Sequence, residues 1–240
     1  MTKRLYYDNA YLKDFEATVV GVSKNDEGKS VFIELDQTAF YPNGGGQPWD
    51  EGELVVNGGS YKVGFVGNFD GKISHAVDKE GIKEGDVVLG KINWERRYKL
   101  MRMHTACHVI SSVFTKDHGV KFTGGQLGVD KSRFDISLEV FDREKIQQYI
   151  DEANVALATA QDTESYSLSR AEALERPELA KLAVGLKEGL DKLRIVKIGD
   201  IDEQADGGTH VKNTSEVGVI GLLKCDNKGK SNRRVYFGLN

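Results

Sequence analysis

The sequence predicts an α+β fold in which a small N-terminal β-barrel or sandwich precedes a domain of mixed helices and strands. Two observations favour it. Up to about residue 92, short stretches rich in Val, Ile, Phe and Tyr alternate with polar residues and are separated by glycine-bearing turns. Beyond that point helical and strand-like patterns mix without strict alternation, which is typical of α+β proteins. We therefore expect one domain over residues 1–92 and a second over residues 93–240.

The N-terminal strands are expected at residues 17–22, 31–35, 53–56, 61–66 and 87–92. Several short strands at this spacing favour a small barrel or sandwich. A helical pattern then runs from residue 94 to about residue 116, and Gly119 is placed to end it. A second helix is expected after Asp142, with its apolar face formed by Ile146, Tyr149, Ile150, Ala153 and Leu157.

The C-terminal part continues with a third helix, for which Ser169 and Glu172 form a capping box. Strands are expected near residues 132–140, 193–198, 218–223 and 233–238.

Composition excludes several classes of protein. Of the 240 residues 39% are hydrophobic and 29% charged, which suits a soluble globular protein and not a disordered one. No apolar run approaches the roughly 18 residues of a membrane span, and the N-terminus lacks the apolar core of a secretory signal. Two cysteines cannot form a disulfide framework, so we expect a reducing, cytoplasmic setting. The absence of a coiled-coil pattern favours a monomer.

The net charge of −4 argues against a protein coated in positive charge for nucleic-acid binding, but not against a local basic patch. One basic run near the C-terminus contains only Asp226 as an acid, and its bases are Lys224, Lys228, Lys230, Arg233 and Arg234. A solvated strand end and turn is the alternative interpretation.

The strongest local motif is His104-Thr-Ala-Cys-His108 on the first long helix. Histidines four residues apart share one helix face and can bind one metal ion. The apolar residues of this helix lie on the side opposite the histidines, so a buried core role fits poorly; they are Ala106, Val109, Ile110, Val113 and Phe114. Two exposed surface histidines are the alternative. No glutamate follows His104 to act as the general base of a metalloprotease, which disfavours that class.

A second motif, Asp206-Gly-Gly-Thr-His210, repeats the four-residue spacing in a glycine-rich loop. Alone it is also an ordinary turn. Together with His104 and His108 it offers three imidazoles and one carboxylate, a small nitrogen-rich set that suits zinc. We therefore predict a helix-borne zinc site formed by these residues.

The third motif is a glycine run, Gly44-Gly45-Gly46, followed by Gln47. Consecutive glycines contribute no side chain and cost backbone entropy, so they favour a close approach of a ligand or another backbone. Exposed amides there are suited to an anion or a carbonyl. A β-bulge or loop is the structural alternative.

Four blocks of sequence together resemble the alanyl-tRNA editing proteins (the AlaX family), free-standing relatives of the editing domain of alanyl-tRNA synthetase. The blocks occur in the family's order over nearly the whole chain, and they are FYPNGGGQP (40–48), WERRYKLMRMHTACH (94–108), DGGTHVKNTSEVG (206–218) and KSNRRVYFG (230–238). The glycine-rich N-terminal part resembles the medium-length class, and this implies a small N-terminal β-barrel followed by a two-layer α/β editing domain.

The resemblance implies an ATP-independent esterase for translation fidelity, which removes serine, and also glycine, from mischarged tRNA-Ala. It implies zinc at His104, His108, Asp206 and His210, although the family has cysteine at the position of Asp206 and often glutamate at that of Asn43. Aspartate is a legitimate but harder zinc ligand. Cys107 points in another direction on its helix and is a poor substitute.

The resemblance also suggests roles for other residues. Thr38 and Gln47 match family positions near the amino acid, and the amides of Gly44, Gly45 and Gly46 are placed for the terminal adenosine or the ester. Candidates for contacts with tRNA phosphates are Arg96, Arg97, Arg102, Lys212, Arg233 and Arg234.

Two other functions stay open at this point. One is a zinc-dependent hydrolase of a small-molecule ester or amide. The other is a non-catalytic tRNA-binding module with purely structural zinc.

Overall fold

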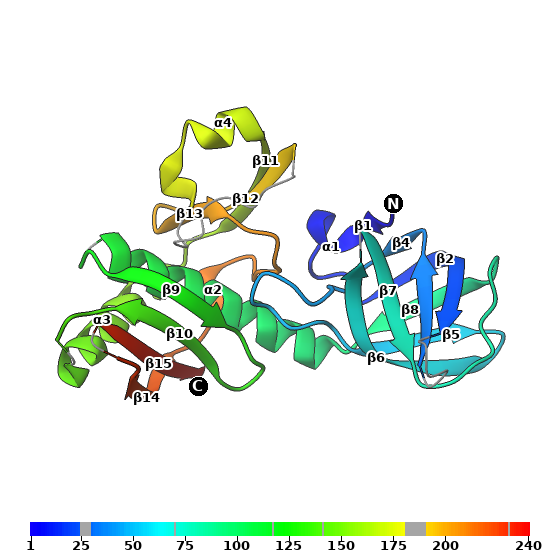
Figure 1. Cartoon of the computed structure of the whole chain (residues 1–240), viewed down its shortest axis with the longest axis horizontal. Helices are drawn as coiled ribbons and strands as arrows, with labels where there is room; N and C mark the ends of the chain where they lie inside the picture. Colours follow the sequence, from blue (N-terminus) through cyan, green and yellow to red (C-terminus); the bar gives the residue numbers. More distant parts are fainter. Residues whose placement is uncertain (25–29, 70, 117, 141, 181–190, 230) are drawn as a thin grey trace. The chain divides into compact units, whose positions relative to one another are not determined.

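A computed structural model describes residues 1–24, 30–69, 71–116, 118–140, 142–180, 191–229 and 231–240 (Figure 1). Its architecture is α+β, as the sequence predicts. Residue contacts divide the chain into two compact units, Met1–Tyr98 and Lys99–Asn240. The predicted domain boundary after residue 92 stays a prediction, because this division falls inside a helix.

The first unit is built on a closed barrel with the strand order β2-β3-β7-β6-β5-β8. Its strands are β2 (Asp14–Lys24), β3 (Val31–Leu35), β5 (Gly52–Val56), β6 (Gly59–Phe69), β7 (Lys72–Val77) and β8 (Val87–Ile92). Alternation fills the interior, since β3 buries Val31, Ile33 and Leu35 while its other residues are half-buried. Two short strands, β1 (Lys3–Arg4) and β4 (Gln37–Thr38), pair in parallel, and the helix α1 (Leu5–Asp8) directly follows β1.

Helix α2 (Trp94–Lys116) begins where Asn93 accepts a hydrogen bond from the backbone N–H of Arg96 (3.2 Å). Its end at Lys116 is followed by Gly119 with φ +66°, the left-handed conformation that glycine takes without strain. Both ends agree with the sequence analysis.

The second unit contains an antiparallel sheet of order β14-β15-β10-β9. Its strands are β9 (Lys121–Gln126), β10 (Ser132–Ser137), β14 (Ile220–Asn227) and β15 (Asn232–Leu239). One face packs on α2, where the ring of Phe114 lies 5.5 Å from that of Phe134. Helix α3 (Arg143–Leu157) adds to the same layer, since Tyr149 lies 5.1 Å from Phe114 (Figure 1). Asp142 caps α3 through Lys145 N, and the predicted apolar residues of α3 are all buried.

A smaller sheet, β11-β12-β13, consists of β11 (Thr163–Ser169), β12 (Lys192–Ile198) and β13 (Asp202–Ala205). Short helices lie along this part of the chain: α4 (Arg170–Leu174), η1 (Pro177–Leu179) and η2 (Thr214–Glu216). The capping box of Ser169 and Glu172 begins α4, as predicted. Among the described residues, no helix combines the length and apolar character needed to cross a membrane.

Candidate metal centre

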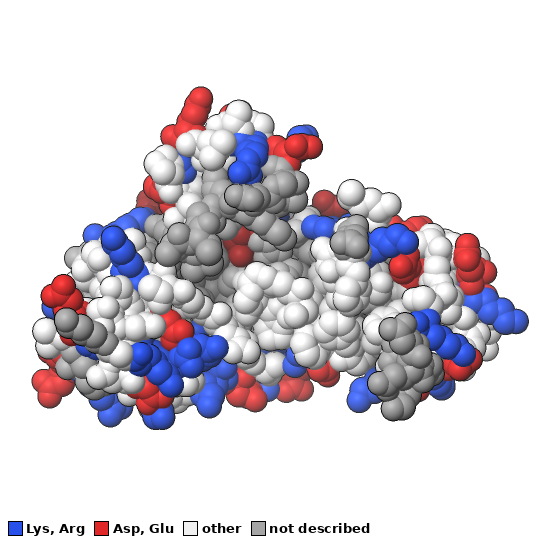
Figure 2. Space-filling model, viewed as in Figure 1, with Lys and Arg blue, Asp and Glu red and all other residues white. Residues whose placement is uncertain are grey.

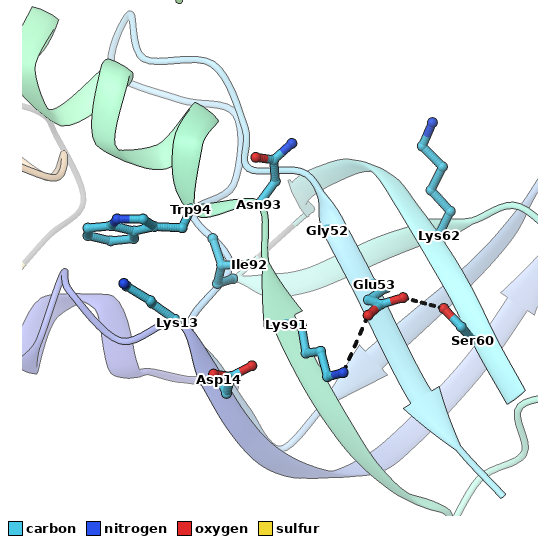
Figure 3. A pocket seen from close by; sticks show the side chains of 10 residues that line it. All are labelled: Lys13, Asp14, Gly52, Glu53, Ser60, Lys62, Lys91, Ile92, Asn93 and Trp94. Carbon is cyan, nitrogen blue, oxygen red and sulfur yellow. Dashed lines mark hydrogen bonds and ion pairs between the residues drawn. The ribbon is translucent and has the colours of Figure 1, made fainter. Parts of the chain in front are cut away.

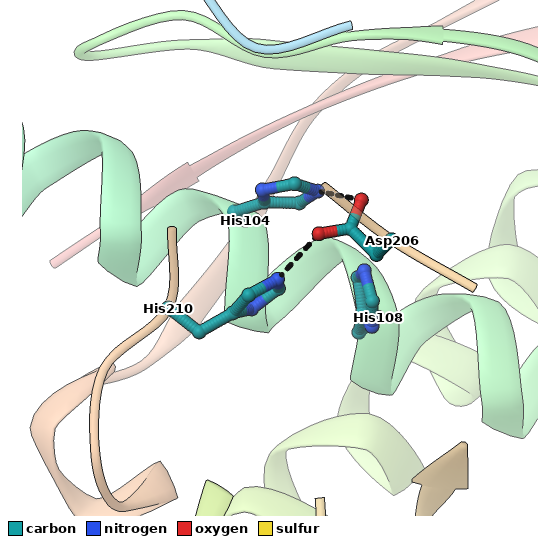
Figure 4. Close-up of side chains that lie close together, drawn as sticks. All are labelled: His104, His108, Asp206 and His210. Carbon is teal, nitrogen blue, oxygen red and sulfur yellow. Dashed lines mark hydrogen bonds and ion pairs between the residues drawn. The ribbon is translucent and has the colours of Figure 1, made fainter. Parts of the chain in front are cut away.

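Four potential metal ligands converge in the second unit (Figure 4). Helix α2 contributes His104 and His108, and the loop after β13 contributes Asp206 and His210. One ligand atom from each residue lies within 4.8 Å of the others. Helix and loop therefore meet at one point, as their matching spacings predict.

The carboxylate of Asp206 lies between two of the imidazoles. Its Oδ2 is 3.0 Å from His210 Nε2, and its Oδ1 is 3.5 Å from His104 Nε2. The backbone N–H of Gly208 donates to Oδ2 at 2.6 Å and fixes the side chain within its own loop. The three rings are close together, with centroids 4.3 Å to 5.0 Å apart.

Two further side chains orient the imidazoles. The Oγ1 of Thr105 lies 3.1 Å from His210 Nδ1, and Asp202 Oδ2 lies 3.1 Å from His108 Nδ1. Contacts from a hydroxyl or carboxylate to the second ring nitrogen are typical of metal-binding histidines, because they fix the ring's tautomer and direction. The His108 contact is within distance but outside hydrogen-bond geometry, so among the described residues His108 Nδ1 has no hydrogen-bond partner.

The environment sets the protonation states that a metal requires. Burial lowers the pKa of His104 to about 4, although Asp206 opposes this effect. Burial also holds the pKa of His210 well below its usual value. Burial raises the pKa of Asp206, but the nearby histidines outweigh that effect and the pKa lies well below its ordinary value. At neutral pH His104 and His210 are therefore neutral and the carboxylate of Asp206 is ionised.

This donor set fits a zinc ion. Zinc takes imidazole nitrogens and carboxylate oxygens at about 2.0–2.2 Å, almost always four together in structural sites. Zinc is the ion we would expect, because a nitrogen-rich set of this size does not suit calcium or magnesium.

Cys107 does not join the cluster, although it lies between the two helical histidines in sequence. Its thiol is free, and burial together with the nearby Asp206 and Asp202 raises its pKa to about 12. A thiol with so high a pKa stays protonated and is a poor metal ligand. The expectation that Cys107 cannot replace the family's cysteine agrees with this environment.

Sequence reasoning missed three residues that support the cluster. Thr105 and Asp202 contact the ring nitrogens, and Arg194 on β12 donates from Nη1 to the carbonyl of Gly208 (3.0 Å) in the ligand loop. Thr105 stands beside His104 and Asp202 stands four residues before Asp206, so proximity to a ligand was the available signal. Arg194 carries no such signal.

The glycine run lies in the first unit and forms an exposed turn. Gly44 and Gln47 exchange backbone hydrogen bonds of 3.0 Å and 3.2 Å. Gly45 and Gly46 have φ of +60° and +82°, so the turn itself requires glycine at these two positions. Gly44 does not have a positive φ, and a Cβ there would meet no described atom within 4 Å. The geometry of the turn therefore does not explain why residue 44 is a glycine. Binding of a ligand by the glycine run stays a prediction.

Thr38 and Gln47 are fully buried in the first unit. The Nδ1 of His75 donates to the carbonyl of Ile33 (2.9 Å), which leaves Nε2 to accept from the Thr38 hydroxyl (2.9 Å). The backbone N–H of Phe40 donates to Thr38 Oγ1 at 3.1 Å. The hydroxyl proton of Thr38 thus points at His75, and its role toward an amino acid stays a prediction.

Two of the predicted phosphate contacts are wrong. Arg97 is fully buried and its guanidinium pairs with Asp50 and with the carbonyl of Ala10. Arg233 is 3% exposed and donates to the carbonyls of Glu139 and Gly229. A guanidinium enclosed in this way cannot reach a phosphate.

The other predicted phosphate contacts differ in their surroundings. Arg96 bonds the carbonyl of Trp49 (3.2 Å), and Arg102 bonds that of Val217 (2.9 Å). Arg234 is paired with Asp135, and Lys212 is exposed. The roles of these four residues toward tRNA phosphates stay predictions.

The first unit also carries an open depression on the barrel (Figure 3). Its lining includes Lys13, Lys62 and Trp94, and Lys91 pairs with Glu53 at 3.6 Å. None of the predicted site residues lines it. The converging histidines and aspartate are therefore the stronger candidate site.

Comparison with known proteins agrees with this geometry. Residues 193–236 match the family described as threonyl and alanyl tRNA synthetase second additional domain, and residues 2–96 match the class II (A) tRNA synthetases. A protein of Methanosarcina mazei named alanyl-tRNA editing protein AlaX-M is 49% identical, covering 100% of this chain and 97% of the relative. Its namesake in Saccharolobus solfataricus is 40% identical, covering 99% of this chain and 98% of the relative.

A longer relative shares the same region. The alanine–tRNA ligase of Pyrococcus abyssi is 38% identical over 98% of this chain, which corresponds to 26% of the ligase. Full-length similarity at these identities, together with the two family matches, shows that the chain belongs to the alanyl-tRNA editing protein family.

Proposed function

We propose that this protein is an aminoacyl-tRNA deacylase that hydrolyses mischarged tRNA-Ala in trans, with serine as its amino acid substrate and glycine as a second. The observation that carries the proposal is the convergence of His104, His108, Asp206 and His210. Relatives that match the chain from end to end are named alanyl-tRNA editing proteins, which supports the same substrate.

The residues of the cluster would hold zinc in the protonation states described above. His104, His108 and His210 would donate imidazole nitrogens, and Asp206 would donate an anionic oxygen. The hydroxyl of Thr105 holds the ring of His210 in direction, and the carboxylate of Asp202 lies beside the ring of His108. When bound, zinc would supply a positive charge that organises the aminoacyl end and the water beside it; with four protein ligands, direct activation of a water would require a ligand to leave or the coordination to expand.

The reaction is the hydrolysis of an ester by water and uses no ATP. Water adds its oxygen to the acyl carbon, the bond to the ribose oxygen breaks, and that oxygen takes up a proton. An editing step of this kind is needed because a small apolar pocket discriminates poorly between side chains that differ by one group.

Serine differs from alanine by one hydroxyl, and the protein offers Thr38 and Gln47 for its recognition. Thr38 Oγ1 donates to His75 and accepts from Phe40, so one lone pair is left to accept from a serine hydroxyl. Both side chains are buried, so this role requires that binding of the aminoacyl end opens the segment around them. Gly44 and its neighbours present exposed backbone to the terminal adenosine or the ester.

The setting we propose is the cytoplasm, where tRNA is charged. The free thiols of Cys107 and Cys225 are compatible with a reducing compartment.

A panel of substrates tests the proposal. Serine-, glycine- and alanine-charged tRNA-Ala are compared with a short serine ester at equal concentration. We expect rapid loss of serine, slower loss of glycine and survival of alanyl-tRNA-Ala. Equal cleavage of seryl- and alanyl-tRNA would refute editing, and full activity on the short ester would identify a small-molecule hydrolase.

A further inference from the structure

The sheet β14-β15-β10-β9 has one face in the core and one face in solvent. Its inner face buries aromatic and aliphatic side chains, namely Phe122, Phe134, Ile136, Val235 and Phe237. Because side chains alternate along a strand, the residues between them point outward. We call the outward set the outer face, and it comprises Gln126, Arg133, Asp135, Lys224, Asp226, Arg234 and Tyr236, with Lys131 beside it.

The strand register arranges these side chains in two rows. In the first row, Gln126 lies opposite Arg133, Arg133 opposite Tyr236 and Tyr236 opposite Lys224. In the second row, Asp135 lies opposite Arg234 and Arg234 opposite Asp226. Directly opposed side chains on one face are neighbours, so the outer face is a continuous surface of charged groups around one aromatic ring.

The cations of the outer face are more exposed than its acids. The side chains of Lys224, Arg133 and Arg234 are 66%, 29% and 25% exposed, against 22% for Asp226 and 14% for Asp135. Arg234 binds both oxygens of Asp135, at 2.7 Å and 2.8 Å, and so holds the carboxylate against the sheet. That hydrogen bonding lowers the pKa of Asp135, which stays ionised and orients the guanidinium.

Tyr236 lies at the centre of the first row with a lysine on each side. Lys131 Nζ is 5.4 Å from the centre of its ring, and Lys224 Nζ is 6.0 Å from it. Both lysines are exposed, as are Lys121 and Lys228. Figure 2 shows blue lysine and arginine atoms gathered over the region that β10 and β15 occupy in Figure 1. Lys230 lies outside the described residues.

We propose that the outer face binds the phosphate backbone of the tRNA, an inference that rests on the proposed function. The whole chain has a net charge of −4, so this face is a local positive area on an acidic protein. A polyanion is the partner that such a charge distribution attracts, and lysine and arginine contacts to phosphate carry a large share of the affinity of nucleic-acid-binding proteins.

The location of the face determines what the contact contributes. Helix α2 packs on the opposite side of the sheet and carries His104 and His108. The outer face is therefore separated from the reacting ester by the sheet and the helix. Contacts made there hold the body of the tRNA equally before and during the reaction, so they lower KM and leave kcat unchanged.

The experiment measures binding of an uncharged tRNA-Ala transcript as a function of salt. The test variant combines Lys131→Ala and Lys224→Ala. The matched control combines Lys79→Ala and Lys145→Ala, because these lysines also lie over tyrosine rings, at 5.0 Å and 5.9 Å. We expect the test variant to bind roughly tenfold more weakly. The slope of log K against log salt concentration should be smaller in magnitude by about 1.5, because each lost phosphate contact reduces that slope by about 0.7–0.9. The control should bind as the native protein does.

A variant that is expected to strengthen binding controls for loss of folding, because a misfolded protein would not bind tRNA more tightly. Asp226→Asn removes a negative charge from the outer face and should strengthen binding. Equal losses in the test and control variants, or an unchanged salt slope, would overturn the proposal. Deacylation of seryl-tRNA-Ala is measured in parallel. If the test variant keeps native activity with an unchanged KM, the role of the outer face is refuted and the proposed function is not. If the native protein is inactive but its binding of tRNA depends on salt through the outer face, the proposed function is refuted and the role of the outer face is not.

Discussion

The Oγ1 of Thr105 lies 3.1 Å from the Nδ1 of His210, although 105 residues separate them in the chain. The same Oγ1 accepts the backbone N–H of Val211 at 3.3 Å. One hydroxyl on α2 thus anchors the ligand loop by its backbone and by its imidazole. With Nδ1 donating to Thr105, Nε2 of His210 is the nitrogen that faces Asp206 and would bind metal.

Replacement of Thr105 tests this anchor. Thr105→Val keeps the shape of the side chain but removes the acceptor, and we expect zinc affinity to fall by about 10–100-fold, the usual effect of losing a partner of a ligand histidine. Thr105→Ser keeps the hydroxyl and should bind zinc as the native protein does. Competition with a chromogenic chelator measures both, and equal affinities in the two variants would contradict the anchoring role.

The nature of the fourth ligand is tested at Asp206. Thiolate is softer than carboxylate and suits zinc better, so Asp206→Cys should bind zinc more tightly than the native protein. Asp206→Ala leaves three imidazoles and should bind it more weakly. If zinc affinity does not change in Asp206→Ala, then Asp206 is not a ligand.

The buried pair of Arg97 and Asp50 predicts a stability effect and not a binding effect. Both side chains are fully buried, and Arg97→Met would leave the Asp50 carboxylate without its main partner. Loss of one member of such a pair costs about 3–5 kcal/mol. Urea unfolding should show this loss for Arg97→Met and a much smaller one for Arg96→Met. A native free energy of unfolding in Arg97→Met would contradict the structural role.

His75 predicts a pH dependence of stability. Burial lowers its pKa to about 4 from 6.5, despite its hydrogen bond to Ile33. Between these values the unfolded chain binds a proton that the folded protein does not, so the free energy of unfolding falls as pH falls, by about 3 kcal/mol across the whole window. Below pH 4 this group adds no further loss.

The comparison variant for this prediction is His75→Gln, which retains hydrogen-bonding groups but does not titrate. Its free energy of unfolding should be less dependent on pH between 4 and 6.5 than that of the native protein. Parallel pH curves for the two proteins would show that His75 is not the responsible group.

Local patterns predicted the helices well. The period of Ile146, Tyr149, Ile150, Ala153 and Leu157 placed α3, and all five are buried. Caps are local as well, and the interactions of Asp142 and Ser169 depend on residues at most three positions away. Such features are encoded within one or two turns of chain, so the sequence is sufficient to find them.

Strands that depend on their neighbours were missed. β9 reads Lys-Phe-Thr-Gly-Gly-Gln and β13 reads Asp-Glu-Gln-Ala, and neither has the alternating apolar residues of an ordinary strand. β11 is polar and buries no residue fully. β7 also had no predicted counterpart. Pairing with β10 and β12 makes β9, β11 and β13 strands, and that context is not visible in a short stretch of sequence.

The candidate site also combines features that local sequence predicts with contacts that it does not. The spacing of each ligand pair is local and gave the four residues of the cluster. The contacts of Thr105 with His210 and of Asp202 with His108 join distant segments, and no local pattern marks them. The error at Arg97 has the same origin, because its partner Asp50 is 47 residues away and charge alone does not distinguish a buried guanidinium from an exposed one.

The most direct measurement is the deacylation of seryl-tRNA-Ala by protein of known zinc content. We predict about one zinc per chain, as expected of one four-ligand site, with loss of activity on removal by a chelator and recovery on adding zinc back. His104→Ala should lack both metal and activity while its circular dichroism spectrum stays native. Full activity in metal-free protein, or in His104→Ala, would contradict the account.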